Sequence, residues 1–196
     1  MKKVLFIAPP FFDYPSVILK GLREEFDHVS YYSSIPSNLL YKVSWYFESL
    51  LGIKFFKKGL MNAHHKSIQN ELERDKTNFN IVFIIKGSLL PIPFYDWLKN
   101  RYSQAIFVQY LWDDVCNDPG AIKVIPFFDK TFSYNPDDCQ EYNLQYRPFF
   151  YDDGYASKQQ EKVYDISCFM SFSRDRITIL NKLFNEEILS LNNCIV

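Results

Sequence analysis

The chain has 196 residues, 47% of them hydrophobic and 18% aromatic, which allows a sizeable core and excludes an intrinsically disordered protein. Its 22 basic and 23 acidic residues give a net charge of −1, which argues against nucleic acid as a partner because no basic surface is available to collect it. The four cysteines form no CxxC pair, so they indicate neither a zinc knuckle nor a disulfide framework, and a cytoplasmic protein with reduced thiols is expected.

The first predicted element is a buried strand, residues 4–8 (VLFIA), which ends at Pro9 and Pro10. Its apolar run is too short for a signal peptide or a membrane span. After a loop, Ser16 is the expected N-cap of a helix, because apolar residues recur at helical spacing beyond it. A strand, a loop and a helix in this order are the usual opening of a doubly wound sheet.

The turn after this strand reads PPFFDYPS, whereas a dinucleotide site would place GxGxxG there. Glycines at that turn let the backbone approach a pyrophosphate, so a tightly bound NAD or FAD is not expected. The loop instead offers Phe11, Phe12 and Tyr14 as walls and Asp13 as a polar contact, which suits a sugar or a lipid-linked acceptor. An equally open interpretation is that the aromatic side chains only cover the edge of the sheet.

Residues 28–32 (HVSYY) predict a second strand, and residues 39–51 and 55–74 predict two helices. His64 and His65 lie in the second helix. Adjacent helix positions diverge by about 100°, so these imidazoles cannot chelate one metal ion as an i, i+4 pair does. Packing or surface exposure is therefore the favoured role of both.

Basic and aromatic residues cluster at the start of this second helix. Lys54, Lys57 and Lys58 lie beside Phe55 and Phe56. Such a cluster is suited to peripheral contact with the anionic surface of the inner membrane. A solvated helix face with its aromatic side chains turned inward explains the same pattern and is the favoured interpretation.

Three apolar runs in the middle of the chain are each followed by a polar cluster. The runs are residues 81–85, 105–111 and 130–134, and the clusters are KG, WDD and NPDD in that order. Successive buried parallel strands place such clusters at their carboxyl ends, where they converge on one crevice. A helix is also predicted over residues 91–102. The sequence therefore predicts a ligand-binding α/β fold with a Rossmann-like, doubly wound parallel sheet.

Two of these clusters contain candidate ligand contacts. Lys86 is suited to contact a phosphate, and Gly87 is suited to let a ligand approach the backbone closely. Together these two residues fall far short of a P-loop. Asp113 and Asp114 follow Trp112, and a carboxylate there can accept sugar hydroxyls, bind a divalent ion or act as a general base. The alternative is that these carboxylates cap the turn that follows.

The third cluster predicts a helix start capped by Asn135 or Asp137, with Asp138 favourable in the first turn. Beyond it, residues 145–151 (QYRPFFY) are expected to be extended. The stretch that follows, residues 152–162, is polar and contrasts with the apolar runs on both sides of it. We therefore expect an N-terminal Rossmann-like domain over residues 1–151, a linker over 152–162 and the incomplete start of a second β-α domain over 163–196, with a strand in residues 164–172 and a helix over 174–184.

Taken together, these segments resemble the bacterial lipopolysaccharide or capsule glycosyltransferases of the two-domain GT-B type, particularly a CgeB-like group. The likeness covers nearly the whole chain and lies in the opening KKVLFIAP, in the succession IKG, QYLWDD, FDKTFSYNPDDCQEY and RPFFY, and in the restart YDISCFMSFSRDR. It implies that the N-terminal half receives the acceptor and that the second domain binds the donor. One departure is the sequence FMSF at residues 169–172, where the family places a glycine-bearing FxG turn.

The resemblance implies transfer of a sugar from a nucleotide-sugar donor to a surface polysaccharide or a lipid-linked oligosaccharide, with no metal and no cofactor beyond the donor itself. Asp113 and Asp13 are the candidate bases. The candidate substrate contacts are Phe12, Tyr14, Lys86, Gly87, Trp112 and Asp114. A complete member is about twice this length, so a second subunit that supplies the donor-binding domain is a further expectation. The alternative is a non-catalytic Rossmann-like module that binds a sugar or a partner and is inactive as a truncated chain.

Overall fold

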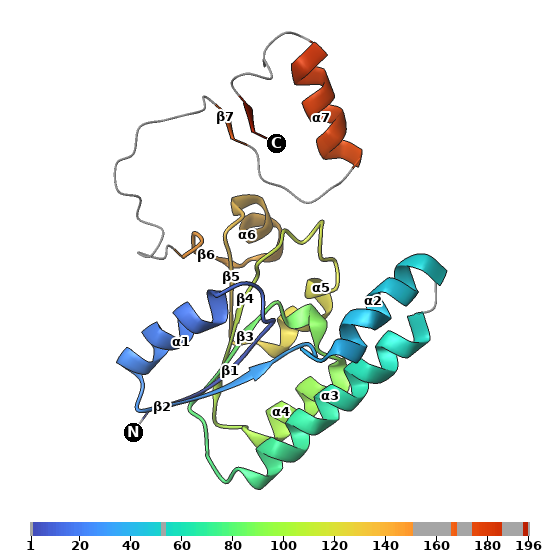
Figure 1. Cartoon of the computed structure of the whole chain (residues 1–196). Coiled ribbons are helices and arrows are strands. Elements are labelled where there is room, and N and C mark those ends of the chain that lie inside the picture. Colours follow the sequence, from blue (N-terminus) through green and yellow to red (C-terminus); the bar gives the residue numbers. More distant parts are fainter. Residues whose placement is uncertain (1, 52–53, 151–165, 168–173, 186–193, 196) are drawn as a thin grey trace. The chain divides into compact units, whose positions relative to one another are not determined.

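The computed structural model describes residues 2–51, 54–150, 166–167, 174–185 and 194–195 (Figure 1). The chain divides into two compact units, Met1–Phe150 and Tyr151–Val196. In the second unit, strands β7 (Ile166–Ser167) and β8 (Cys194–Ile195) pair in parallel, and helix α7 spans Arg174–Asn185. The linker predicted over residues 152–162 lies outside the described residues, as does most of the apolar run over 164–172.

The first unit contains a six-stranded sheet in the order β2-β1-β3-β4-β5-β6, and every neighbouring pair is parallel. The strands are β1 (Lys3–Ala8), β2 (His28–Ser33), β3 (Ile81–Ile85), β4 (Ile106–Tyr110), β5 (Lys130–Ser133) and β6 (Gln145–Tyr146). Helices flank this sheet, so the Rossmann-like α/β fold predicted from the sequence is confirmed.

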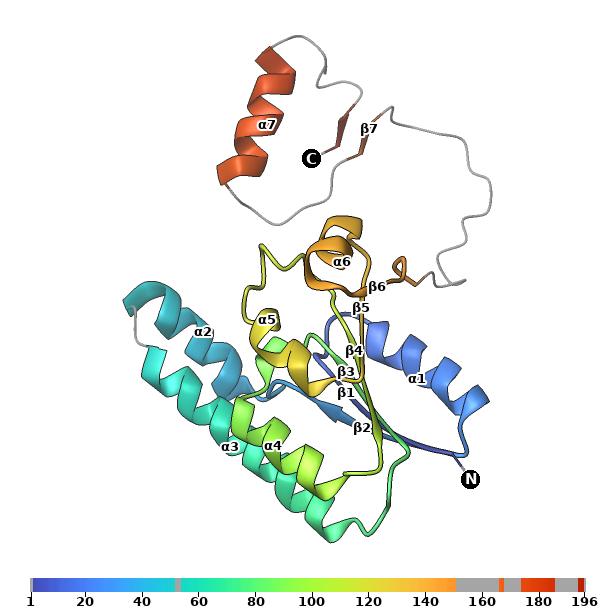
Figure 2. The ribbon, with the colours of Figure 1, turned by 180° about the vertical axis from the view of Figure 1, so that it is seen from behind.

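Helices connect successive strands. They are α1 (Tyr14–Glu25), α2 (Leu39–Leu51), α3 (Lys54–Arg74), α4 (Ile92–Arg101), α5 (Ala121–Val124) and α6 (Pro136–Tyr142), with 3₁₀ turns at Gly87–Leu89 and Ile125–Phe127. Figures 1 and 2 show α1 on one face of the sheet and α3 and α4 on the other. The helices predicted over 39–51, 55–74 and 91–102 are confirmed to within one residue at each end.

The strand order reverses between β1 and β3. The chain steps from β1 to β2 through α1, passes back across β1 through α2 and α3, and then continues outward from β3. In open α/β sheets, ligands bind outside the carboxyl ends of the strands at this switch point. The expected ligand-binding crevice is therefore framed by the segments that follow Ala8, Ile85 and Tyr110.

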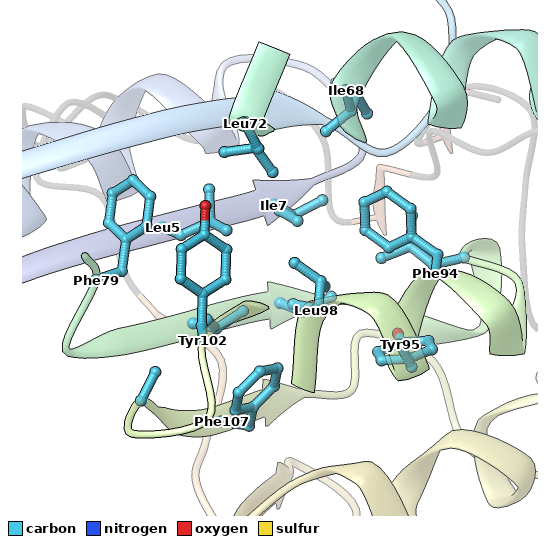
Figure 3. Packing of buried hydrophobic residues seen from close by; sticks show 14 of the residues in the cluster. Leu5, Ile7, Ile68, Leu72, Phe79, Phe94, Tyr95, Leu98, Tyr102 and Phe107 are labelled. Atoms are coloured by element: carbon cyan, nitrogen blue, oxygen red, sulfur yellow. The ribbon is translucent and has the colours of Figure 1, made fainter. Parts of the chain in front are cut away.

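The larger core lies between the sheet and helices α3 and α4, and Figure 3 shows its packing. Leu5 and Ile7 point to this side of β1, whereas Phe6 and Ala8 join the smaller core beneath α1. This alternation follows from the two-residue repeat of a strand, and it explains why an uninterrupted apolar run occupies β1. Further members of the larger core are Ile68, Leu72, Val82, Ile84, Phe94, Leu98 and Phe107.

Helix α1 begins at Tyr14, so the prediction that Ser16 is its N-cap was wrong. Asp13 occupies the N-cap position, although its side chain makes no capping hydrogen bond. Pro15 lies in the first turn, where a helix has no use for the N–H that proline lacks. The proline therefore starts the helix earlier than the apolar spacing suggests.

The two histidines of α3 tie this helix to the end of β2. His64 Nε2 lies 2.8 Å from the carbonyl oxygen of Ser33, and His65 Nε2 lies 2.9 Å from that of Ser34. His65 is buried, and burial lowers the pKa of its imidazole. These contacts bear out the packing role for His65.

Candidate functional site

An ion pair joins the carboxyl ends of β3 and β4. Lys86 follows β3, Asp113 lies in the loop after β4, and Lys86 Nζ donates to Asp113 Oδ2. Their side chains are 23% and 40% exposed, so water or a ligand can reach both groups. The fold thus brings together one residue from each of two polar clusters that the sequence suggested separately.

The backbone of Lys86 is in the left-handed region, with φ 53° and ψ 59°. A non-glycine residue is strained there, and such strain persists only where surrounding contacts hold the chain in place. One of these contacts is the hydrogen bond from the Lys86 N–H to the carbonyl oxygen of Tyr110, at 3.2 Å. A second link between the same two loops is the hydrogen bond from Ser88 Oγ to Asp118 Oδ2.

Gly87 is buried directly after Lys86. A Cβ atom added there would lie 2.5 Å from the Tyr95 hydroxyl oxygen and 2.7 Å from Gln109 Nε2. Burial raises the pKa of Tyr95, so its hydroxyl stays protonated, and it donates to the Gly87 carbonyl oxygen at 2.7 Å. Packing beneath the crevice therefore accounts for this glycine, and the approach of a ligand to its backbone stays a prediction.

Aromatic rings from the β1–α1 loop, the first residue of α1 and the β4–α5 loop form a wall beside the ion pair. Phe11 stacks on Trp112 with 6.3 Å between ring centroids, and Tyr14 meets Trp112 edge-on at 5.7 Å. Lys86 Nζ lies 5.9 Å from the centroid of Phe11. Trp112 Nε1 is buried without a hydrogen-bond acceptor among the described residues. We call Phe11, Tyr14 and Trp112 the aromatic wall.

Phe12 differs from its neighbours because its side chain is 85% exposed. Its backbone is left-handed, with φ 46°, which is strained for a bulky residue. The ring contacts Tyr14 edge-on, with 5.6 Å between centroids. Two strained non-glycine residues, Phe12 and Lys86, therefore stand in the loops that frame the crevice, where strain often accompanies function.

Asp114 is held by neighbouring polar groups. Asn135 Nδ2 donates to Asp114 Oδ1 at 3.0 Å, and Asn117 Nδ2 donates to Asp114 Oδ2 at 3.5 Å. Burial, together with the hydrogen bond and charge of Asp114, raises the pKa of Tyr134 to about 12. These contacts favour the alternative in which Asp114 stabilises the loop, and its contact with a substrate stays a prediction.

The cluster after β5 has the structural role expected of it. Asn135 Oδ1 accepts from the N–H of Asp137 at 2.9 Å and so caps α6. Asp138 is buried, and its Oδ2 accepts from the N–H of Val115 at 2.9 Å. This second contact crosses to the loop after β4 and braces the segment that carries Asp113.

Asp13 is the candidate that the structure does not bring to the ion pair. It is exposed at the start of α1, and no hydrogen bond or ion pair within the described part of the chain joins its side chain to Lys86 or Asp113. The sequence suggested both Phe11 and Phe12 as walls, but it did not show that Phe11 stacks on Trp112 whereas Phe12 contacts Tyr14. A strand that ends in two prolines does not indicate in which direction the side chains of Phe11 and Phe12 point.

Compared with protein-family models, with curated proteins and with solved structures, the chain gives no match. In the described ranges, no three histidine, cysteine or acidic side chains are grouped in a way that would hold a metal ion. No helix in those ranges is both long enough and apolar enough to cross a bilayer. Lys57 in the basic cluster forms an ion pair with Glu48 of α2, and membrane contact by this cluster stays a prediction.

Proposed function

We propose that this chain is the acceptor-side part of a glycosyltransferase, which presents a glycan hydroxyl to a nucleotide-sugar donor. The observation that carries the proposal is the Lys86–Asp113 ion pair at the switch point, beside the aromatic wall. Aromatic rings offer flat apolar surfaces to the C–H faces of sugars, and a carboxylate accepts sugar hydroxyls. A cation in the same crevice stabilises a phosphate.

In this proposal Asp113 is the base and Lys86 contacts the leaving diphosphate. The acceptor hydroxyl oxygen attacks the anomeric carbon, its proton passes to Asp113, and the bond to the diphosphate breaks with both electrons leaving on the phosphate. The ion pair is partly exposed, and such pairs contribute only about 0–1 kcal/mol. A phosphate that takes Lys86 therefore displaces Asp113 at little cost and leaves its carboxylate ready to accept the proton.

The second candidate function is sugar binding without turnover. Its support is the ion pair itself, because the proposed base Asp113 is engaged by the cation of Lys86. A module of this kind would use the same wall and the same carboxylate to hold a glycan. The two functions make the same prediction for binding and opposite predictions for transfer.

Transfer from a panel of radiolabelled nucleotide sugars to lipid-linked oligosaccharides, with the full chain, separates the two. We expect Asp113→Asn to keep glycan binding within about threefold and to lower transfer by about 10²–10⁴-fold. Lys86→Met should weaken binding of a nucleoside diphosphate by about tenfold or more, since a charge-assisted contact is lost. Asp13→Asn should leave transfer unchanged if Asp113 is the base.

The matched control is Lys99→Met. Lys99 Nζ lies 3.6 Å from Asp129 Oδ2 in a second partly exposed pair, near the amino ends of β4 and β5. This substitution removes one positive charge and one ion pair away from the crevice, so binding and transfer should not change. Full transfer by Asp113→Asn would overturn the base role, and glycan binding without any transfer would support the module.

A further inference from the structure

The part of the chain that the structure describes covers the face of the sheet beneath α1 incompletely. On the other face, Val82, Ile84 and Phe107 are fully buried under α3 and α4. On the α1 side, Phe83 of β3 and Val108 of β4 are only half-buried. Parallel sheets are normally covered on both faces, so this side of β3, β4 and β5 presents apolar surface that calls for a partner.

This surface forms an open groove of about 400 Å³, within the range of small-molecule pockets. Its walls are apolar apart from one arginine and come from three places: α1 and its end (Ile18, Leu22, Phe26), the four central strands (Val4, Ile81, Phe83, Ile85, Val108, Tyr110, Phe132) and the segment after β6 (Arg147, Pro148, Phe150). The groove runs about 13 Å along β3, which suits an extended chain of roughly ten methylenes.

One end of the groove adjoins the candidate site. Phe150 lines the groove, and its ring meets Tyr14 of the aromatic wall edge-on, with 5.4 Å between centroids. Tyr110 also lines the groove, and its carbonyl oxygen accepts from the Lys86 N–H. A ligand can therefore extend from the groove to the Lys86–Asp113 pair.

Arg147 is the charged side chain of the groove. Its guanidinium lies 5.9 Å from the centroid of Phe132, and its backbone N–H donates to the Ser133 carbonyl oxygen at 2.8 Å. It is exposed and forms no ion pair with a residue that the structure describes. An apolar groove with a single cation at its margin matches an amphiphile with an aliphatic chain and an anionic head.

The groove fits a chain of methylenes better than a helix. A three-turn α-helix is about 16 Å long and about 10 Å across, which is about two strand spacings, whereas an extended methylene chain is much narrower. The geometry of a helix also supplies no negatively charged group that would pair with Arg147.

We propose that this groove holds the aliphatic chain of a lipid-linked acceptor, with the lipid phosphate at Arg147 and the glycan directed toward Asp113. The inference rests on the proposed transfer function, because it gives the lipid part of the acceptor a place beside the reacting hydroxyl. The apolar lining binds the chain through its buried methylenes. Arg147 and the groove length select a phosphorylated chain.

Titration calorimetry of the full chain with n-alkyl phosphates, kept below their micelle concentrations, tests the proposal. Each added methylene should tighten binding by about fourfold, up to roughly ten carbons, after which the affinity should level off. Val108→Trp fills the groove and should weaken binding by at least about tenfold. Ile122→Trp, a similar though slightly smaller enlargement at an exposed position of α5, should leave the affinity unchanged.

The head group is tested with Arg147→Gln. This variant should bind alkyl phosphates about tenfold more weakly and n-alkanols as well as the unmodified chain does. Lys123→Gln, which removes a cation from α5, should change neither affinity. If Val108→Trp does not fold, an alkyl phosphate with a diazirine at its far end replaces it, and cross-links at Val4 or Ile81 are then expected.

Failure of the inference and failure of the transfer function are distinguishable. Lys86→Met and Asp113→Asn should keep the dependence on chain length, because neither residue lines the groove. Absence of transfer by the unmodified chain, with its dependence on chain length intact, would count against the transfer function alone. An affinity that is flat across the alkyl series, binding only to anionic vesicles, or a dimer that Val108→Trp dissociates would overturn the inference.

Discussion

Lys86 and Asp113 form an ion pair although 27 residues separate them in the chain. The pair exists because β3 and β4 are parallel neighbours, which brings their carboxyl ends to the same edge of the sheet. Lys86 reaches Asp113 from a left-handed backbone conformation. Side-chain charge and backbone strain are thus combined at one residue, and substitutions can separate them.

Lys86→Gly should be more stable than Lys86→Ala by about 1 kcal/mol. Both variants lose the ion pair, but glycine adopts a φ of 53° without the steric cost that alanine pays. Urea denaturation of the two variants measures the difference. Equal stabilities would show that the left-handed conformation is not retained at this position.

Gly87→Ala should destabilise the fold by about 1–3 kcal/mol, because its Cβ would overlap the buried side chains of Tyr95 and Gln109. Gly21→Ala is the matched control. No atom lies within 4 Å of a Cβ there, and the position is inside α1, so we expect a gain of about 0.5–1 kcal/mol. Thermal unfolding of both variants checks the contrast, and a harmless Gly87→Ala would contradict the packing of Tyr95 on Gly87.

Asp138→Ala should cost about 1–3 kcal/mol, because the buried N–H of Val115 loses its acceptor. Asp137→Ala, at the exposed neighbouring position, should cost less than about 1 kcal/mol, the value of a charge at a helix N-terminus. Chemical denaturation gives both values. If the two losses are equal, the contact from α6 does not stabilise the loop after β4.

The stability of the fold should fall as the pH drops from about 7 toward 5, in part through His65. Burial lowers the pKa of His65, so below the ordinary pKa of histidine the unfolded chain binds a proton that the folded chain resists. His65→Gln should make the free energy of unfolding less dependent on pH in this range. His28→Gln, at an exposed position, is the control, and an equal effect of both substitutions would contradict the assignment.

The sequence predicted the elements because their signals are local. Residues 81–85 match β3 at both ends, since a short apolar run bounded by polar residues admits few alternatives. The extended stretch predicted over 145–151 is shorter in the structure, where β6 covers Gln145–Tyr146. Pro148 has no N–H to donate to a strand ladder, which accounts for the early end.

The candidate site was less predictable because it depends on contacts between distant segments. Lys86 and Asp113 each gave a weak signal. The local sequence around either residue does not determine the strand order that brings the two together. The open groove was not foreseen either. An uninterrupted apolar run, such as the one that forms β3, predicts that the strand is buried on both faces of the sheet. Only the folded structure shows that Phe83 remains half-buried.

The position of β1 between β2 and β3 also has a consequence for synthesis of the chain. Val4 pairs with Ile81, and 77 residues separate the two. At about 5–20 residues per second, the ribosome needs roughly 4–15 seconds to make the second partner of β1 after the first strand is complete. During that interval one edge of an apolar strand is unpaired, and we expect the nascent chain to depend on a chaperone until β3 arrives.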